Sequence, residues 1–108
     1  MKAHLIGPPG AGPPSIPLIM MLDTGADVTC VPSWLWPSSW PAKVASSLDG
    51  VGGRAEAMIS ETDITIVLED PDRPAQIIRV RPYITAIGEP LLGRDALLQS
   101  GFHLTNLG

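Results

Sequence analysis

The side chains with the clearest chemical potential are those of Asp23, Thr24 and Gly25, which follow an apolar stretch at residues 16–22. A buried strand ending there would deliver the Asp23 carboxylate to a tight turn. Thr24 can hydrogen-bond across such a turn, and Gly25 lets the backbone of a ligand approach closely. The tripeptide therefore predicts an acid at the floor of a cleft, while an Asx-type turn without chemistry explains it equally well.

The other reactive side chains do not form a recognisable site. Cys30 is the one cysteine, so no internal disulfide forms, and its spacing from His4 and His103 fits no zinc motif. We therefore expect no metal and no cofactor. Cys30 is predicted to be a small core residue rather than a nucleophile, and the two histidines to lie at the surface or at sheet edges.

A glycine- and proline-rich segment at residues 7–14 looks like the first half of a phosphate-binding loop. Such a loop needs a lysine and then a hydroxyl residue directly after its last glycine. Here Pro13 and Pro14 supply neither a charge nor a backbone N–H. Nucleotide binding is therefore disfavoured, and we expect an exposed, extended connector.

Length and composition predict one small β-rich domain. The chain has 108 residues, 44% of them hydrophobic and 17% charged, which is typical of a folded protein. Its 11 glycines and 12 prolines interrupt helices, so an all-β fold over residues 1–108 is expected. Because a chain of this size buries a modest core, a partner subunit would stabilise it.

Charge and hydropathy disfavour nucleic acid and membranes as partners. Seven basic residues against 11 acidic ones give a net charge of −4, and no basic cluster is present to contact phosphates. The longest apolar run contains Pro17 and is much shorter than the roughly 20 residues that span a bilayer. The first nine residues lack the apolar core of a signal peptide, so no targeting segment is expected.

Hydrophobic periodicity predicts the elements that would position Asp23. We expect a buried strand, a tight turn and a second strand over residues 16–32, and then a loop pinned by buried indoles. The alternative is that the tryptophan rings stack on a ligand. The remaining predictions are a glycine-rich hairpin tip at 48–54, a hairpin pairing 64–68 with 77–80, a short helix after Arg94 and Asp95, and a closing strand at 102–107.

Three segments in order resemble retroviral aspartic proteases, the retropepsins. They are Asp-Thr-Gly-Ala-Asp-Val-Thr at 23–29, Asp-Gly-Val-Gly-Gly at 49–53 and Leu-Leu-Gly-Arg-Asp-Ala-Leu-Leu at 91–98. The two Trp-Pro steps and residues 101–107 look most like alpharetroviral and betaretroviral members. The resemblance implies a closed-barrel protomer with one short C-terminal helix. It also implies a C2 homodimer in which terminal strands 2–6 and 103–107 interleave.

The mechanism that the resemblance implies needs two copies of the chain. Two carboxylates a few ångströms apart cannot both ionise, so they share one proton. One then deprotonates a water while the other protonates the scissile carbonyl oxygen. Since one chain holds a single Asp-Thr-Gly, the second Asp23 must come from a second copy.

The resemblance also implies a role for individual residues. Catalysis falls to Asp23, Thr24 and Gly25, and pairing with Asp27 falls to Arg94. Contacts with the peptide fall to Ala26, Asp27, Cys30, Asp49, Gly50, Val51 and Leu91. The glycines at 50–53 could instead form an ordinary hairpin turn, and residues 94–95 a solvated helix start.

The expected function is a homodimeric aspartic endopeptidase that cleaves extended segments of a viral Gag-Pro-Pol-type polyprotein. Such a protein would act in the virion or in the host cytoplasm as part of that polyprotein. The alternative is a non-catalytic dimerisation or peptide-binding module from an endogenous element.

Overall fold

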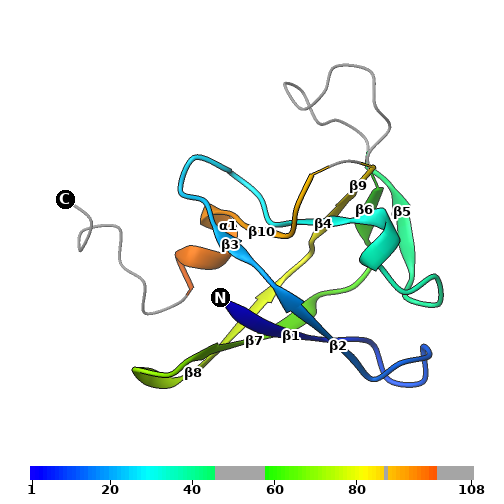
Figure 1. The fold of residues 1–108 in the computed structure, drawn as a ribbon. Helices are drawn as coiled ribbons and strands as arrows, with labels where there is room; N and C mark the ends of the chain where they lie inside the picture. The colour runs from blue at the N-terminus through cyan, green and yellow to red at the C-terminus, as the bar shows by residue number, and fades with distance from the viewer. Residues whose placement is uncertain (46–57, 87, 100–108) are drawn as a thin grey trace.

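The computed structural model describes residues 1–45, 58–86 and 88–99, which form two β-sheets and one short helix. The first sheet has the order β2-β1-β7-β8, and every neighbouring pair in it is antiparallel. Its strands are β1 (Lys2–Ile6), β2 (Ser15–Ile19), β7 (Ile64–Asp70) and β8 (Arg73–Val80). Figure 1 shows these strands together in the lower part of the molecule.

The second sheet has the order β3-β10-β4-β9-β6-β5. Its strands are β3 (Met21–Leu22), β4 (Cys30–Pro32), β5 (Ala42–Val44), β6 (Met58–Ser60), β9 (Tyr83–Thr85) and β10 (Leu91–Leu92). Strand β10 pairs in parallel with β3, and β4 pairs in parallel with β9. Helix α1 (Arg94–Leu97) follows β10 directly, and a 3₁₀ turn, η1 (Ser33–Leu35), follows β4. The predicted β-rich fold with one short helix is confirmed.

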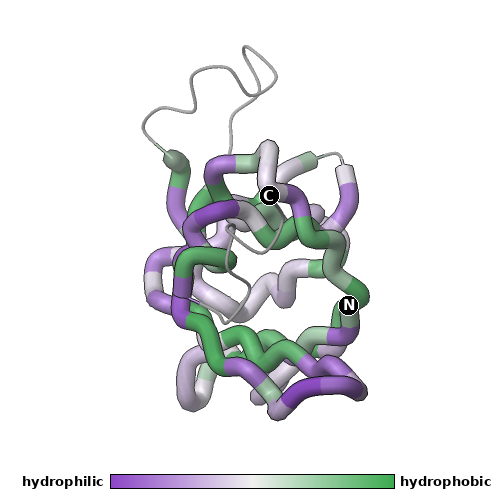
Figure 2. Tube along the Cα trace, turned by 90° about the vertical axis from the view of Figure 1, so that its left-hand side faces the viewer, coloured by the Kyte–Doolittle hydropathy of each residue, from purple (hydrophilic) through white to green (hydrophobic). Residues whose placement is uncertain are grey.

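Alternation along the strands builds a single apolar core that both sheets share. In β7, Ile64, Ile66 and Leu68 are buried while the residues between them are less covered, as expected for period-two side chains. Leu5 from β1 and Val31 from β4 join the same cluster. Figure 2 shows apolar stretches in both sheets. Val31 of β4 and Leu92 of β10 belong to this core, so it anchors the strand that follows the Asp23 turn and the strand that pairs beside it.

The predicted closed barrel is not found. In the part of the chain that the structure describes, the strands form two open sheets, whose outer strands are β2 and β8 in one and β3 and β5 in the other. Among the described residues, the outer strands of each sheet do not pair with each other, and β3 and β10 are only two residues long. The fold is therefore mostly β without the expected closure.

The prediction that residues 2–6 interleave with a partner is wrong. Strand β1 pairs with β2 along one edge, where Ala3 lies opposite Leu18, and with β7 along the other, where Ala3 lies opposite Leu68. Both edges therefore already have backbone partners within the protomer, and no row of N–H and C=O groups remains for a second copy. The other predicted interleaving strand, 103–107, lies outside the described residues.

The apolar run at residues 16–22 forms two strands instead of one. Strand β2 ends at Ile19, β3 begins at Met21, and the two belong to different sheets. Met20 lies between them and is almost completely buried, and its N–H donates to the Met1 carbonyl at 2.8 Å. The chain thus crosses from one sheet to the other at Met20, which carries it toward Asp23.

Residues 7–14 are the loop of the β1–β2 hairpin, not the extended connector predicted. Gly7 N–H donates to the Pro14 carbonyl at 3.0 Å, which closes the loop, and the Trp40 indole N–H donates to the Pro13 carbonyl at 3.0 Å.

The indole of Trp36 donates to the Trp40 carbonyl at 3.2 Å. The prediction of buried indoles holds for these two tryptophans and is wrong for Trp34, which is 64% exposed.

The predicted hairpin at 64–80 is confirmed. Ile64 lies opposite Val80 and Ile66 opposite Ile78, and a register irregularity lies near the turn between Leu68 and Asp70. No helix in the described part of the chain is long and apolar enough to span a bilayer.

Candidate functional site

Asp23 lies at the first residue after β3, in a turn that its own side chain closes. Its N–H donates to the Leu92 carbonyl at 3.0 Å, which extends the β3–β10 pairing by one bond. Gly25 N–H donates to Asp23 Oδ1 at 2.9 Å, and Ala26 N–H donates to the Asp23 carbonyl at 3.1 Å. The turn is therefore of the Asx type, and it orients a carboxylate that stays half-buried.

A side chain at Gly25 would crowd the Asp23 carboxylate. A Cβ on Gly25 would lie 3.2 Å from Asp23 Oδ1, in the region that the hydrogen bond occupies. Thr24 and Gly25 are both exposed, so the tip of the turn faces away from the core. A backbone or a side chain from another molecule has direct access to it.

Asp27 and Arg94 form an ion pair beside this turn. Arg94 Nη2 donates to Asp27 Oδ1, and both side chains are exposed. The backbones of the two segments are also joined, because Arg94 N–H donates to the Ala26 carbonyl at 2.8 Å and Asp95 N–H donates to the Asp27 carbonyl at 3.2 Å. The start of α1 is thus bound to the end of the Asp23 turn.

Thr29 and Asp95 lie beneath this pair and were not singled out from the sequence. The Thr29 hydroxyl donates to Asp95 Oδ1 at 2.8 Å, and Thr29 N–H donates to Asp95 Oδ2 at 3.1 Å. Thr29 is fully buried. The available signal was a hydroxyl residue directly before the apolar strand β4, but its partner is 66 residues away, so sequence spacing could not identify it.

Cys30 and Leu91 lie opposite each other on the neighbouring strands β4 and β10. The Cys30 thiol is partly buried and donates to the Val28 carbonyl at an S···O distance of 3.7 Å. Burial raises the pKa of this thiol above its ordinary value, and the negative charge of Asp95 raises it further. Because the thiolate is the nucleophilic form, this shift disfavours a nucleophilic role for Cys30.

Asp49, Gly50 and Val51, the remaining predicted contacts to a peptide, lie outside the described residues. Within the described ranges, no group of three or more His, Cys, Asp or Glu side chains is arranged to hold a metal ion.

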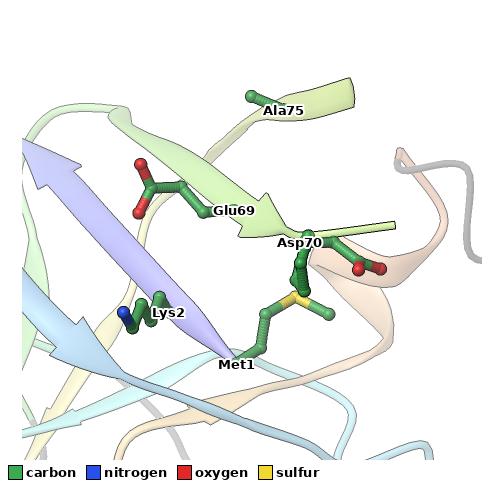
Figure 3. A pocket seen from close by; sticks show the side chains of 6 residues that line it. Met1, Lys2, Glu69, Asp70 and Ala75 are labelled. Atoms are coloured by element: carbon green, nitrogen blue, oxygen red, sulfur yellow. The ribbon is translucent and has the colours of Figure 1, made fainter. Parts of the chain in front are cut away.

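A cavity of about 610 Å³ lies away from the Asp23 turn, between the start of β1 and the β7–β8 hairpin. Figure 3 shows the side chains around it. Its lining residues are Met1, Lys2, Glu69, Asp70, Pro71 and Ala75. None of these residues belongs to the Asp23 turn or to α1, so the cavity is not part of the candidate site.

Comparison with known proteins identifies similar chains. The family model described as retroviral aspartyl protease matches residues 14–105. The chain is 42% identical over 86 residues to the human endogenous retrovirus group K member 25 Pro protein, a match that covers 79% of this chain and 53% of that protein. It is 31% identical over 99 residues to the Gag polyprotein of avian leukosis virus subgroup A (isolate RSA), which covers 86% of this chain and 14% of that protein.

The chain thus spans about half the length of the Pro protein that it matches and a small part of the Gag polyprotein. The matched residues include the Asp23 turn, β4, β10 and α1. The resemblance seen in three short segments therefore extends over most of the chain, and the chain belongs to the retroviral aspartyl protease family.

Proposed function

We propose that two copies of this chain form an aspartic endopeptidase that cleaves extended segments of a retroviral polyprotein. The observation that carries the proposal is the Asp23 turn. It presents one oriented, half-buried carboxylate at an exposed tip, with a single Asp-Thr-Gly in the whole chain. One carboxylate supplies half of an acid–base pair, and a twofold axis beside the turn supplies the other half.

In the proposed reaction the two Asp23 carboxyl groups share one proton. The ionised group takes a proton from a water molecule, whose oxygen attacks the carbonyl carbon of the peptide bond. The protonated group gives its proton to the carbonyl oxygen, and a tetrahedral intermediate forms. When the C–N bond breaks, the carboxyl group that took the proton from water gives it to the leaving nitrogen. The other carboxylate takes back the hydroxyl proton as the carbonyl re-forms, so the pair again holds one proton. Thr24, next to the axis, would join the two turns.

Binding of the peptide would use the groups around the turn. Gly25 and Asp27 are exposed and Ala26 is partly exposed, so all three could hydrogen-bond an extended main chain. Cys30 and Leu91 lie on adjacent strands and would contribute to an apolar subsite. Asp49, Gly50 and Val51 would complete the site as a hairpin over the peptide, a role that rests on family membership.

The polyprotein substrate is proposed from the relatives. Two of them are the Gag and Gag-Pol polyproteins of avian leukosis virus, so a chain like this one occurs inside such precursors. Residues 1–108 would act as one protease domain, in the virion or in the host cytoplasm. No cofactor is required by this mechanism.

The test is cleavage of a matching Gag precursor by the purified chain, with and without Asp23→Asn. The substitution keeps the side-chain size and removes the acid–base group, so activity should fall by a factor of about 100 or more. Pepstatin should inhibit the wild-type reaction. A folded wild-type chain that binds the peptide without cleaving it would show a non-catalytic binding module instead.

A further inference from the structure

A buried hydroxyl and a partly buried carboxylate join the Asp23 turn to α1 at a place that takes no direct part in the proposed reaction. Asp95 accepts three hydrogen bonds: from the Thr29 hydroxyl at 2.8 Å, from Thr29 N–H at 3.1 Å and from Ala96 N–H at 2.7 Å. The Thr29 oxygen also accepts a hydrogen bond from Gly93 N–H at 3.2 Å. We call Thr29 and Asp95 the clamp.

The clamp is connected to Asp27 and Arg94 through the backbone. Asp95 N–H donates to the Asp27 carbonyl, and Arg94 N–H donates to the Ala26 carbonyl, so each residue of the ion pair is fixed through its backbone to the other segment. Asp95 is adjacent in sequence to Arg94, and Thr29 is two residues beyond Asp27. Any displacement of the clamp therefore moves both members of the pair.

The ion pair cannot hold this geometry alone. The Arg94 and Asp27 side chains are 50% and 76% exposed, and exposed ion pairs contribute only about 0–1 kcal/mol because water screens them and both side chains lose conformational freedom. The clamp differs, since Thr29 is 0% exposed. Its hydrogen bonds to the Asp95 carboxylate are partly buried, and hydrogen bonds to an ionised group are stronger than those between neutral groups.

We propose that Thr29 and Asp95 are positioning residues, which hold Asp27 and Arg94 in the orientation that binds the main chain of the peptide substrate. This inference rests on the proposed function. It assigns the clamp a role in substrate affinity, distinct from the acid–base step at Asp23. Loosening the clamp should therefore raise KM and leave kcat nearly unchanged, because the interaction lost is uniform binding.

Thr29→Val and Thr29→Ser form a matched pair for the test. Valine has the shape of threonine but leaves Asp95 without one donor and Gly93 N–H without an acceptor, whereas serine keeps both hydrogen bonds. With a fluorogenic peptide from the Gag cleavage site, Thr29→Val should raise KM about tenfold, in the range that a small misplacement of a binding group produces. Thr29→Ser should retain most of the wild-type KM. Titration of active sites with pepstatin normalises kcat to the folded fraction.

A double-mutant cycle with Asp27→Asn separates positioning from general stability. If the clamp acts through Asp27, its effect on KM should largely disappear once Asp27 has lost its charge, so the two changes should be less than multiplicative. A purely structural role would lower the folded fraction and leave the cycle multiplicative. Should Thr29→Val not fold, Asp95→Asn, which keeps the side-chain size, enters the same cycle.

An unchanged KM in Thr29→Val, or effects of Thr29→Val and Asp27→Asn that multiply, would overturn the positioning role while leaving the protease proposal intact. Absence of cleavage by the folded wild-type dimer would instead reject the proposed function, and the positioning role with it.

Discussion

At the scale of single residues, the three tryptophans differ in burial, although the sequence predicted all three to be buried. Trp40 is almost completely buried, donates from its indole to the Pro13 carbonyl and packs edge-on against Trp36 with ring centroids 5.2 Å apart. Trp34 is largely exposed, although it lies only two positions before the buried Trp36. Residue type predicted large buried area for all three, but only the fold decides which ring reaches the core.

This difference gives a matched pair of substitutions. Trp40→Phe removes the indole donor and leaves space in the core, so it should lower the free energy of unfolding by about 1–3 kcal/mol. Trp34→Phe should change it by less than about 0.5 kcal/mol. Urea denaturation at one fixed protein concentration measures both. Equal effects of the two changes would contradict the packing described for Trp40.

The candidate site was partly predictable at this scale. The Asp-Thr-Gly sequence located the Asp23 turn because its chemistry is local, a side chain that hydrogen-bonds two residues ahead. The contact between Thr29 and Asp95 was not predictable, because it depends on pairing between segments 66 residues apart. A local motif can therefore predict a turn, whereas hydrogen bonds between distant segments, such as that of Thr29 with Asp95, depend on the tertiary structure.

At the scale of elements, the approach of α1 to the Asp23 turn depends on Gly93. A Cβ at this position would lie 2.4 Å from the Val28 carbonyl carbon, although the backbone of Gly93 is extended and would accept any residue. The constraint is therefore space between the residue before α1 and the segment before β4. Gly10 is the opposite case, with a φ of +77° and open space around it.

Gly93→Ala should consequently destabilise the protein more than Gly10→Ala. The first change forces backbone apart and should cost about 3 kcal/mol or more, while the second adds only the penalty for a left-handed residue, about 1–2 kcal/mol. Thermal unfolding followed by circular dichroism compares the two variants. A Gly93→Ala protein as stable as Gly10→Ala would mean that the two segments are not so closely packed.

At the scale of elements, hydrophobic alternation predicted where strands lie better than it predicted which strands pair with each other. Alternation at 64–68 and 77–80 gave the hairpin correctly, since both strands and their turn are adjacent in the chain. The run at 16–22 was predicted as one strand because hydropathy does not reveal that the chain changes sheets at Met20. For the same reason residues 2–6 were misplaced: pairing on both edges of β1 is a property of the sheet.

At the scale of the whole molecule, the account depends on two copies sharing one site. Each chain holds one Asp-Thr-Gly, and the described residues place the Asp23 turn at an exposed tip instead of inside the cavity near the β7–β8 hairpin. The sequence predicted the need for a second copy from this count. The sequence did not predict which surfaces join the two copies. Residues 2–6, expected at that interface, pair with β2 and β7 of their own chain.

The stoichiometry of inhibitor binding tests the shared site most directly. Pepstatin mimics the tetrahedral intermediate and so should occupy a site formed by both Asp23 carboxyl groups. Isothermal titration calorimetry, at protein concentrations where sedimentation shows a dimer, should give one pepstatin bound per two chains. One pepstatin per chain, or no binding to the folded protein, would contradict a single active site built from two copies of Asp23.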